Sequence, residues 1–385
     1  MAWEFSARDF VLGIVTGGVT TVALLSIGAF IFLRSYNIYS VGHWKLNIRT
    51  PFPSMWMNLG FWKTNDGKPI IHFSEAARAL LERILDAAGL LARDEDSKTE
   101  PSRETVAVLD LGFGCGDQTI ALAEMIQAQT RPHFKYVGLS LDSSQVQTAQ
   151  RTLDRALKLS GASASGGSTQ DSFNLYCANA AKPETWSRAI RTSVDALADG
   201  AFTQRWMLAL DCLYHFSPSR KPAFKLAAGT LNANVMAFDL VLDENASQWN
   251  KFLVRIVGLV MNCPLYTFLP EQQYREQLVE CGYDRARIEI QDISDHVFGG
   301  VSGFLRTQEA ALSQYGIGIG GFKLAGRLFE WMAPASGLSV HGSPFQKPIK
   351  LCGQQWDISP LSHHRPLGGM VGKPSTRRTY SWSDL

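Results

Sequence analysis

Four residues in one short segment have the types and spacing of a small-molecule binding loop. Asp110 precedes three alternating glycines, Gly112, Gly114 and Gly116, in the run DLGFGCG. Glycine allows a tight backbone turn and lets a ligand approach the main chain closely. The run follows an apolar segment typical of a buried strand and precedes a helical pattern. Because open α/β sheets bind ligands at the carboxyl ends of their strands, these residues predict a ligand site.

The glycine spacing distinguishes two classes of ligand. A dinucleotide loop has the pattern G-x-G-x-x-G and presents a pyrophosphate to a helix N-terminus. Here the pattern is G-x-G-x-G, and the helix opens with Asp117, whose charge would repel a pyrophosphate. S-adenosylmethionine (SAM) carries a sulfonium and an ammonium cation, which a nearby carboxylate suits. We therefore expect SAM as the cofactor, and a nucleotide-dependent oxidoreductase is the disfavoured alternative.

The segments around the loop alternate between strand and helix patterns. Helices are expected at 117–129 and 143–160, and strands at 106–112, 134–141, 173–180, 205–211 and 234–242, with a further helix and a sixth strand within 270–294. This alternation predicts an α/β protein with a Rossmann-like, parallel sheet and helices on both faces. No seventh strand is identified, because the chain from about 337 is rich in Gly, Pro, Ser and basic residues and has no clear period.

The run VLDLGFGCGDQT resembles the first motif of the class I SAM-dependent methyltransferases, and the resemblance extends from about 55 to 300. It implies that Asp110 and the three glycines wrap the amino-acid end of SAM. The later run GLSLDSSQ is similar to that of the cyclopropane synthase, tocopherol and sterol methyltransferase branch. By this resemblance, Ser140 and Gln145 contact the ribose and methionine portions. Asp142 is either part of that site or the cap of the next helix.

The same resemblance implies that Asn179 and Ala180, in the place of the family's Asp-Ala pair, lie beside the adenine. An amide oxygen can still accept a hydrogen bond from the adenine amino group.

A cluster of functional side chains follows the fourth expected strand, at the carboxyl edge of the sheet. Asp211 is assigned to the cofactor site. His215 is a candidate general base, because its ordinary pKa near 6.5 suits proton removal at neutral pH; the alternative is a structural histidine. Tyr214 is expected to orient the substrate that accepts the methyl group (the acceptor), or to stabilise a cation that develops during methylation of an alkene.

Two apolar segments are candidates for the acceptor pocket. Segments similar to NLGFW precede the cofactor domain in related small-molecule methyltransferases and act as a lid, which assigns Trp56, Asn58 and Trp62 to that role here. The alternative is amphipathic packing next to the membrane. Residues 252–269 are expected to form an apolar cap over the acceptor pocket that dips into the bilayer, or else a buried helix.

The N-terminal segment predicts a membrane anchor. Val11–Leu33 carry no charge, and about 23 residues at ~1.5 Å each span a ~30 Å hydrocarbon core. The run is longer than the apolar part of a cleaved signal peptide, which is the alternative. Arg34, Lys45 and Arg49 follow the run and only Arg8 precedes it, so the catalytic part is expected in the cytosol, at the endoplasmic reticulum membrane in a eukaryote.

Composition excludes other functions. The chain has 385 residues, with 37 basic and 35 acidic residues and a net charge of +2, which gives no electrostatic basis for nucleic-acid binding. The charged fraction of 19% is low, which favours contact with a membrane or an apolar ligand. The six cysteines contain no CxxC pair, and His363 and His364 have no partners at ligand spacing, so neither a metal site nor a disulfide framework is expected.

These observations predict a single-pass membrane methyltransferase that acts on a lipophilic small molecule of the sterol, prenylated quinone, fatty acyl or polyketide type. The alternative is a catalytically silent, membrane-bound interaction module. The expected organisation is an anchor at 1–36, a lid, helix and linker at 37–105, a SAM-binding domain at 106–300 with a cap insertion at 245–270, a helical part at 301–336 and a disordered tail at 337–385. The sequence does not indicate an oligomeric state.

Overall fold

The computed structural model describes residues 6–35, 50–91, 104–127, 133–159, 172–333 and 347–355. The sequence also predicts a charged linker at 92–105 and, from the run GASASGGSTQDS, a low-complexity surface loop at 161–172. Most of these two segments and most of the expected tail, including His363 and His364, lie outside the described residues. The outcome for those segments therefore stays a prediction.

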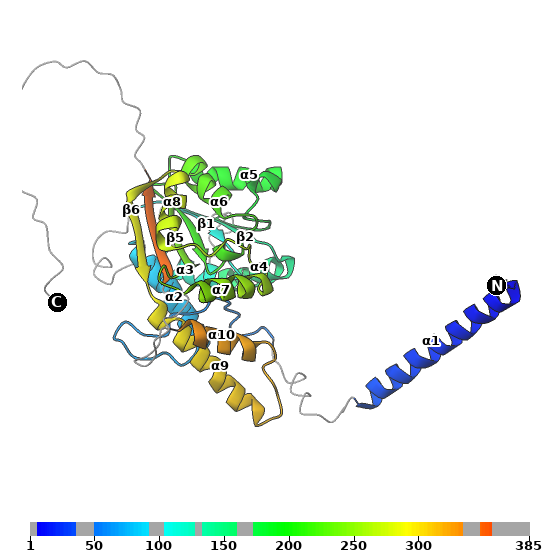
Figure 1. Cartoon of the computed structure of the whole chain (residues 1–385). Helices are drawn as coiled ribbons and strands as arrows, with labels where there is room; N and C mark the ends of the chain where they lie inside the picture. The colour runs from blue at the N-terminus through cyan, green and yellow to red at the C-terminus, as the bar shows by residue number, and fades with distance from the viewer. Residues whose placement is uncertain are drawn as a thin grey trace, which may run out of the picture. The chain divides into compact units, whose positions relative to one another are not determined.

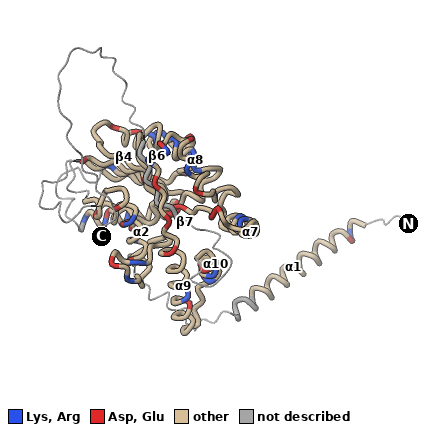
Figure 2. The backbone as a smooth tube through the Cα atoms, turned by 60° about the vertical axis from the view of Figure 1, so that its left-hand side comes forward, with Lys and Arg blue, Asp and Glu red and all other residues tan. Residues whose placement is uncertain are grey.

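The expected N-terminal anchor corresponds to helix α1, Ala7–Ser35. Its segment Ala7–Ala29 is long and apolar enough to cross a membrane, and its side chains are exposed. In Figure 2, the coloured charged residues of α1 lie near its N-terminal end, and the described helix that follows them carries none up to Ala29. An exposed apolar surface of this length is unfavourable in water and is typical of a membrane span, although a signal sequence has the same composition.

A seven-stranded sheet forms the centre of the α/β part (Figure 1). Its spatial order is β3-β2-β1-β4-β5-β7-β6, and all pairings are parallel except those of β7. The strands are β1 Val106–Leu111, β2 Phe134–Ser140, β3 Phe173–Cys177, β4 Gln204–Leu210, β5 Asn234–Val241, β6 Tyr283–Asp292 and β7 Lys347–Gln355. The expected Rossmann-like α/β architecture is confirmed. Strands that follow β1 in sequence are added on one side of it as far as β3, and β4 and β5 are then added on the other side. The strand order therefore reverses between β1 and β4, and open parallel sheets bind ligands at such a point.

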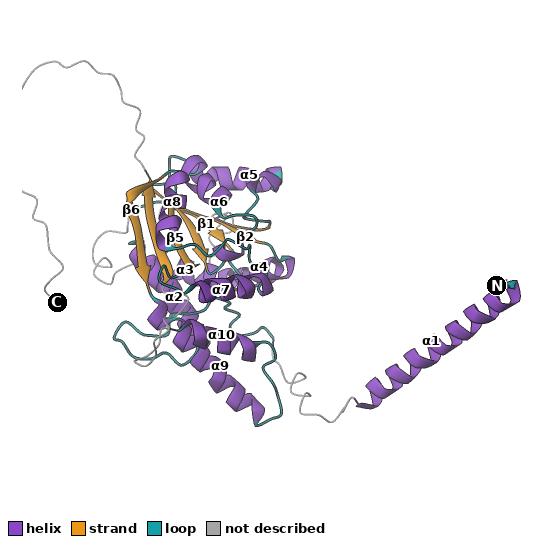
Figure 3. Cartoon of the chain, viewed as in Figure 1, coloured by secondary structure: helices purple, strands orange, loops and turns teal. Residues whose placement is uncertain are grey.

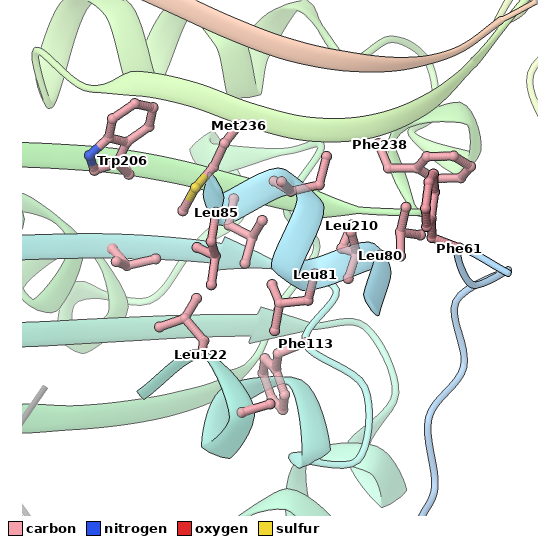
Figure 4. Close-up of a cluster of buried hydrophobic side chains, with 14 of the residues drawn as sticks. Phe61, Leu80, Leu81, Leu85, Phe113, Leu122, Trp206, Leu210, Met236 and Phe238 are labelled. Carbon is pink, nitrogen blue, oxygen red and sulfur yellow. The ribbon is translucent and has the colours of Figure 1, made fainter. Parts of the chain in front are cut away.

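Helices cover both faces of the sheet (Figure 3). One face packs against α2 Phe73–Ala87, α3 Asp117–Met125 and α4 Ser143–Leu159, and the other against α5 Arg188–Asp195, α6 Lys221–Lys225 and α8 Glu271–Glu280. Successive strand residues serve opposite faces, as the period of a strand requires: Val108 packs with the first group and Leu109 with the second. Figure 4 shows the first core, in which α2 lies over the central strands.

Three further helices and five short helical turns complete the described elements. The helices are α7 Gln248–Val260, α9 Phe298–Ser313 and α10 Phe322–Met332. The turns are η6 Pro183–Thr185, η7 Ala196–Ala198, η8 Leu213–His215, η9 Leu226–Thr230 and η10 Ser294–His296. The expected helical character of 301–336 is seen in α9 and α10.

Strand β7 corrects the expectation that the chain is without regular structure from 337 onward. Lys347–Gln355 pairs antiparallel with β5 on one side and with β6 on the other. A strand held by two neighbours satisfies its backbone hydrogen bonds on both edges, and this can outweigh a weak local pattern. Because β7 lies between β5 and β6, β6 is the edge strand of the sheet. Strand β7 alone runs antiparallel to its neighbours.

Candidate active site

A cavity of about 740 Å³ lies at the carboxyl ends of β1, β2 and β4. The loops that follow these strands form one end of it. Segment 55–59 contributes a second wall, and α7, α10 and the segment after α7 contribute a third. The cavity therefore joins the glycine loop to the cluster that follows β4, as the sequence predicts for a site at the edge of an open sheet.

The glycine loop lies partly in the cavity wall and partly in the protein interior. Gly112 and Gly114 line the cavity. Gly114 has a φ of +68°, and a Cβ there would have only the Met57 Sδ atom within 4 Å, at 3.8 Å. Gly116 does not line the cavity: a Cβ would lie 2.9 Å from Ala149 Cα, so this glycine allows α3 to pack closely on α4. Gly114 thus keeps space open for a ligand, whereas Gly116 serves packing.

Asp110 does not reach the cavity, in contrast to the role implied by the resemblance. Its side chain is fully buried, and it accepts hydrogen bonds from Gln118 Nε2 at 2.9 Å and from the Tyr136 hydroxyl at 2.6 Å. Burial raises the pKa of Asp110 to about 6, although both hydrogen bonds favour its charged form. Asp110 therefore ties β1 to α3 and β2 beneath the glycine loop.

Asp117, the first residue of α3, is an acidic residue that lines the cavity beside the glycine loop. Its Oδ1 atom accepts a hydrogen bond from the Met55 backbone N–H at 3.2 Å. Its Oδ2 atom is buried and has no hydrogen-bond partner among the described residues. An unpaired buried carboxylate oxygen is costly, and a cationic ligand would satisfy it. The sequence contains a signal for a cation-binding role of Asp117, because this acidic residue opens the helix directly after the glycines. From the sequence alone, its charge serves only as a reason to disfavour a pyrophosphate.

The end of β2 supplies a polar wall. Ser140 Oγ donates a hydrogen bond to Gln145 Oε1 at 2.8 Å, and both side chains line the cavity. Asp142 also lines it and caps α4, because its Oδ1 accepts the backbone N–H groups of Ser144 at 2.7 Å and Gln145 at 3.2 Å. The hydrogen bond from the Ser144 hydroxyl is the main cause that lowers the pKa of Asp142. Asp142 therefore caps α4 and also borders the cavity, so its part in the cofactor site stays a prediction.

Asn179 and Ala180 also line the cavity, after β3. Asn179 Oδ1 accepts the Ala181 backbone N–H at 2.9 Å, and its carbonyl oxygen accepts Trp186 Nε1 at 2.8 Å. The Asn179 carboxamide is therefore held in one orientation.

Asp211 connects the end of β4 to the segment expected to form the lid. Its backbone has a φ of +66°, a left-handed conformation that Asp tolerates better than most residues. Its Oδ2 accepts the Leu59 backbone N–H at 2.8 Å, and its Oδ1 accepts the Tyr214 hydroxyl at 2.8 Å. Burial raises the pKa of Asp211 to about 7 and outweighs both hydrogen bonds. Asp211 therefore fixes the positions of Leu59 and Tyr214, and it also lines the cavity.

Tyr214 and His215 both line the cavity, but they differ in freedom. Tyr214 is buried and its hydroxyl is committed to Asp211. His215 is exposed at the cavity, and its Nδ1 lies 3.4 Å from Cys263 Sγ. Partial burial of the ring lowers the pKa of His215, and the negative charge of Asp239 opposes this. The lowered pKa favours the neutral form of His215, which can accept a proton.

In the aromatic segment 56–62, some residues line the cavity and others pack against the rest of the protein. Trp56 and Asn58 line the cavity. The Asn58 amide donates to Ala77 O at 3.2 Å and its Oδ1 accepts the Gly60 N–H at 2.9 Å, so it also fixes the turn. Trp62 does not line the cavity; it packs against Phe73 and Phe304. Packing therefore accounts for Trp62, and cavity contact for Trp56 and Asn58.

The far end of the cavity is apolar. Its wall is formed by side chains from α7, α10 and the segment between α7 and α8, namely Val257, Met261, Phe268, Phe329 and Met332. The cap expected at 252–269 corresponds to α7, which begins at Gln248, and to the segment that follows it. The α10 residues were missed by sequence reasoning, because an ordinary amphipathic helix carries no signal of which cavity it borders.

Comparison with known proteins adds a limited observation. No protein-family model and no curated protein matches the sequence. Among solved structures, the [4+2]-cyclase SpnF has 16% identity over 79% of this chain and 89% of its own, with a TM-score of 0.47. The cyclopropane synthase MmaA2 from Mycobacterium tuberculosis has 13% identity over 71% and 85%, with a TM-score of 0.45. A geranyl diphosphate methyltransferase in complex with SAM has 13% identity over 77% and 98%, with a TM-score of 0.46.

The fold is a Rossmann-like α/β fold with helices on both faces of the sheet. Its strand order, with β7 antiparallel between β5 and β6, is seen directly in the structure and does not depend on these similarities. The fold expected from the glycine loop and the strand pattern is therefore confirmed, whereas activity has to be argued from the site.

Proposed function

We propose that this protein is a SAM-dependent methyltransferase that acts on a lipophilic small molecule at a membrane surface. The observation that carries the proposal is the cavity itself. One continuous space joins a polar end, with a glycine loop and the unpaired Oδ2 atom of Asp117, to an apolar end walled by α7 and α10. A two-substrate enzyme needs such a division, because the two reactants must meet in one place.

The polar end fits SAM in its chemistry. The buried, unpaired Oδ2 of Asp117 suits the ammonium group of the methionine portion. Gly112 and Gly114 leave the backbone accessible, and Ser140, Gln145 and Asn179 present polar groups to the ribose and adenine. Bound there, SAM would supply an activated methyl group. Asp110 and Gly116 would support this site from behind by fixing α3 on the sheet.

The apolar end fits a lipophilic acceptor. Pockets lined mainly by apolar side chains bind through burial of apolar surface, with a few polar groups that set orientation. Tyr214 and His215 are polar groups beside the apolar wall: the Tyr214 ring centre lies 6.4 Å from that of Phe268, and His215 Nδ1 lies 3.4 Å from Cys263 Sγ. Sterol, prenylated quinone, fatty acyl and polyketide acceptors all meet this description.

The chain's own residues would contribute alignment, exclusion of water and a proton acceptor. Segment 55–59, held by Asp117 and Asp211, covers the polar end. His215, kept neutral by burial, would remove the proton that the acceptor loses, and Tyr214 would orient the acceptor. Helix α1 would hold the protein at the membrane in which a lipophilic acceptor dissolves.

The test is incubation of detergent-solubilised full-length protein with methyl-labelled SAM and a total lipid extract, followed by analysis of labelled lipids. Titration calorimetry with SAM, S-adenosylhomocysteine and NAD(P)H accompanies it. We expect SAM binding and a labelled lipid product. SAM binding without any product would favour the silent interaction module, and binding of NAD(P)H instead of SAM would refute the proposal.

A further inference from the structure

Helix α7, Gln248–Val260, has an inner face that belongs to the cavity. Val254 and Gly258 are buried, and Val257 borders the cavity. A Cβ at Gly258 would lie 2.7 Å from the Phe268 ring, which shows how closely the following segment packs on the helix. The inner face of α7 is therefore a wall of the apolar end.

The outer face of the same helix exposes large apolar side chains. They are Trp249, Phe252, Ile256, Leu259 and Val260, which recur at helical spacing and form one stripe. Trp249 is 64% exposed and Val260 is 79% exposed. A stripe of this kind, exposed on a folded domain, marks a surface that meets a membrane or a partner.

The polar residues of α7 favour a membrane over a protein partner. The helix contains Lys251 and Arg255 and no acidic residue. The rings of Trp249 and Phe252 stack at 5.5 Å, and the Arg255 guanidinium lies 5.7 Å from the centre of the Tyr266 ring. Basic side chains beside exposed Trp, Phe and Leu are typical of helices that lie in the interface of an anionic bilayer.

If α1 spans a membrane, the chain would also keep this surface close to it. Residues 36–49 join α1 to the rest of the chain, and fourteen residues span at most about 50 Å when fully extended. Helix α10 lies beside α7 in Figures 1 and 2 and exposes Phe322 and Leu324 as well. A domain on so short a connection has repeated access to the lipid surface, so that even a weak interfacial helix would engage it.

We propose that the outer face of α7 lies in the interface of an anionic bilayer, so that the cavity behind it receives its acceptor directly from the membrane. The role in acceptor delivery rests on the function proposed above, whereas the contact with lipid does not. A lipophilic acceptor would then pass from the bilayer along α7 to Met261 and Phe268 without crossing water.

Photo-cross-linking of the full-length protein in phosphatidylcholine vesicles, with and without phosphatidylglycerol, tests this contact. The probe p-benzoylphenylalanine replaces Val260 in one variant and Ile71 in the control. Ile71 is 74% exposed and lies outside α7, so it matches Val260 in apolar character and exposure. A second probe at Trp249 replaces one large exposed aromatic residue by another.

We expect lipid adducts at positions 260 and 249, stronger with phosphatidylglycerol, and few at position 71. Equal adducts at 260 and 71 would refute the proposal, because mere proximity to the vesicle would explain them. Adducts of position 260 with a second copy of the chain, or no lipid adducts at 260 and 249, would also refute it. SAM binding by the same variants is measured separately, so failure of the methyltransferase proposal remains distinguishable from failure of the membrane contact.

Discussion

Among single residues, Gly114 gives the most direct test of the cofactor site. The space at its Cβ position opens into the cavity, and the wild-type protein is expected to bind SAM with a low- to mid-micromolar dissociation constant. Gly114→Val should abolish binding in titration calorimetry, because the side chain would occupy that space.

The matched control for Gly114→Val is Gly67→Val. Gly67 has a similar left-handed φ of +81°, is exposed and has nothing within 4 Å of its Cβ position. Both variants carry the backbone strain of roughly 1–3 kcal/mol that a branched residue meets in this region. Normal SAM binding by Gly114→Val, or equal loss in both variants, would contradict the proposed role of the loop.

His215 is the second residue that can be tested alone. If it accepts a proton during turnover, His215→Gln should lower the rate by roughly 100- to 10,000-fold and leave SAM affinity nearly unchanged. Because burial lowers the pKa of His215 below 6.5, wild-type activity should fall as the pH drops through that lowered pKa and be level above it. Initial rates across the pH range, with the variant's folding checked by circular dichroism, provide the measurement. Near-normal turnover in a folded variant would leave His215 with a structural role.

Among the structural elements, the hydrogen bond between Asp211 and Leu59 determines how segment 55–59 is held. The pKa of Asp211 is raised to about 7 chiefly because this arrangement buries it. Opening of the segment would expose the carboxyl and return its pKa toward the ordinary value, so the closed form binds the proton more tightly. Closure is therefore strongest at low pH, weakens as the pH rises from the ordinary pKa of 3.8 toward about 7, and is level above about 7.

Amide hydrogen exchange of Leu59, corrected for the intrinsic pH dependence of exchange, should show this. We expect its protection to fall as the pH rises toward about 7 and to level off above that value. The dependence should disappear in Asp211→Asn, which cannot titrate, and persist in Tyr214→Phe, which loses only the hydroxyl contact. Protection that increases with pH would show that hydrogen bonding to the charged form outweighs burial.

For the whole molecule, α1 and the α/β part should be separable in function. The residues that line the cavity lie between Met55 and Met332, so deletion of residues 1–35 should preserve SAM binding. The full-length protein should resist extraction from membranes by alkaline carbonate, because a spanning helix is not removed by charge or salt. The truncated protein should be extracted fully, since an interfacial contact through α7 is reversible. Carbonate-resistant binding after the deletion would identify another segment as the anchor.

Local signals in the sequence were sufficient for most of the architecture. The apolar character of α1, the alternating elements from β1 to β6 and the left-handed glycines after β1 were all visible without a structure. Each is written into neighbouring residues: a span in uninterrupted apolar composition, a buried parallel strand in a short apolar run, and a tight turn in glycine. These features determined the fold class and the place of the candidate cofactor site.

The tertiary structure decided which of those residues meet. It buried Asp110 against Gln118 and Tyr136, and it left an oxygen of Asp117 unpaired at the cavity. It also brought Leu59 to Asp211 across 152 positions of sequence and placed β7 between β5 and β6. The contact of Leu59 with Asp211 and the place of β7 are not encoded by spacing along the chain, because both depend on how segments far apart in sequence are arranged around the sheet. Burial then set the pKa values and the exposed side chains that distinguish a ligand-binding group from a packing group.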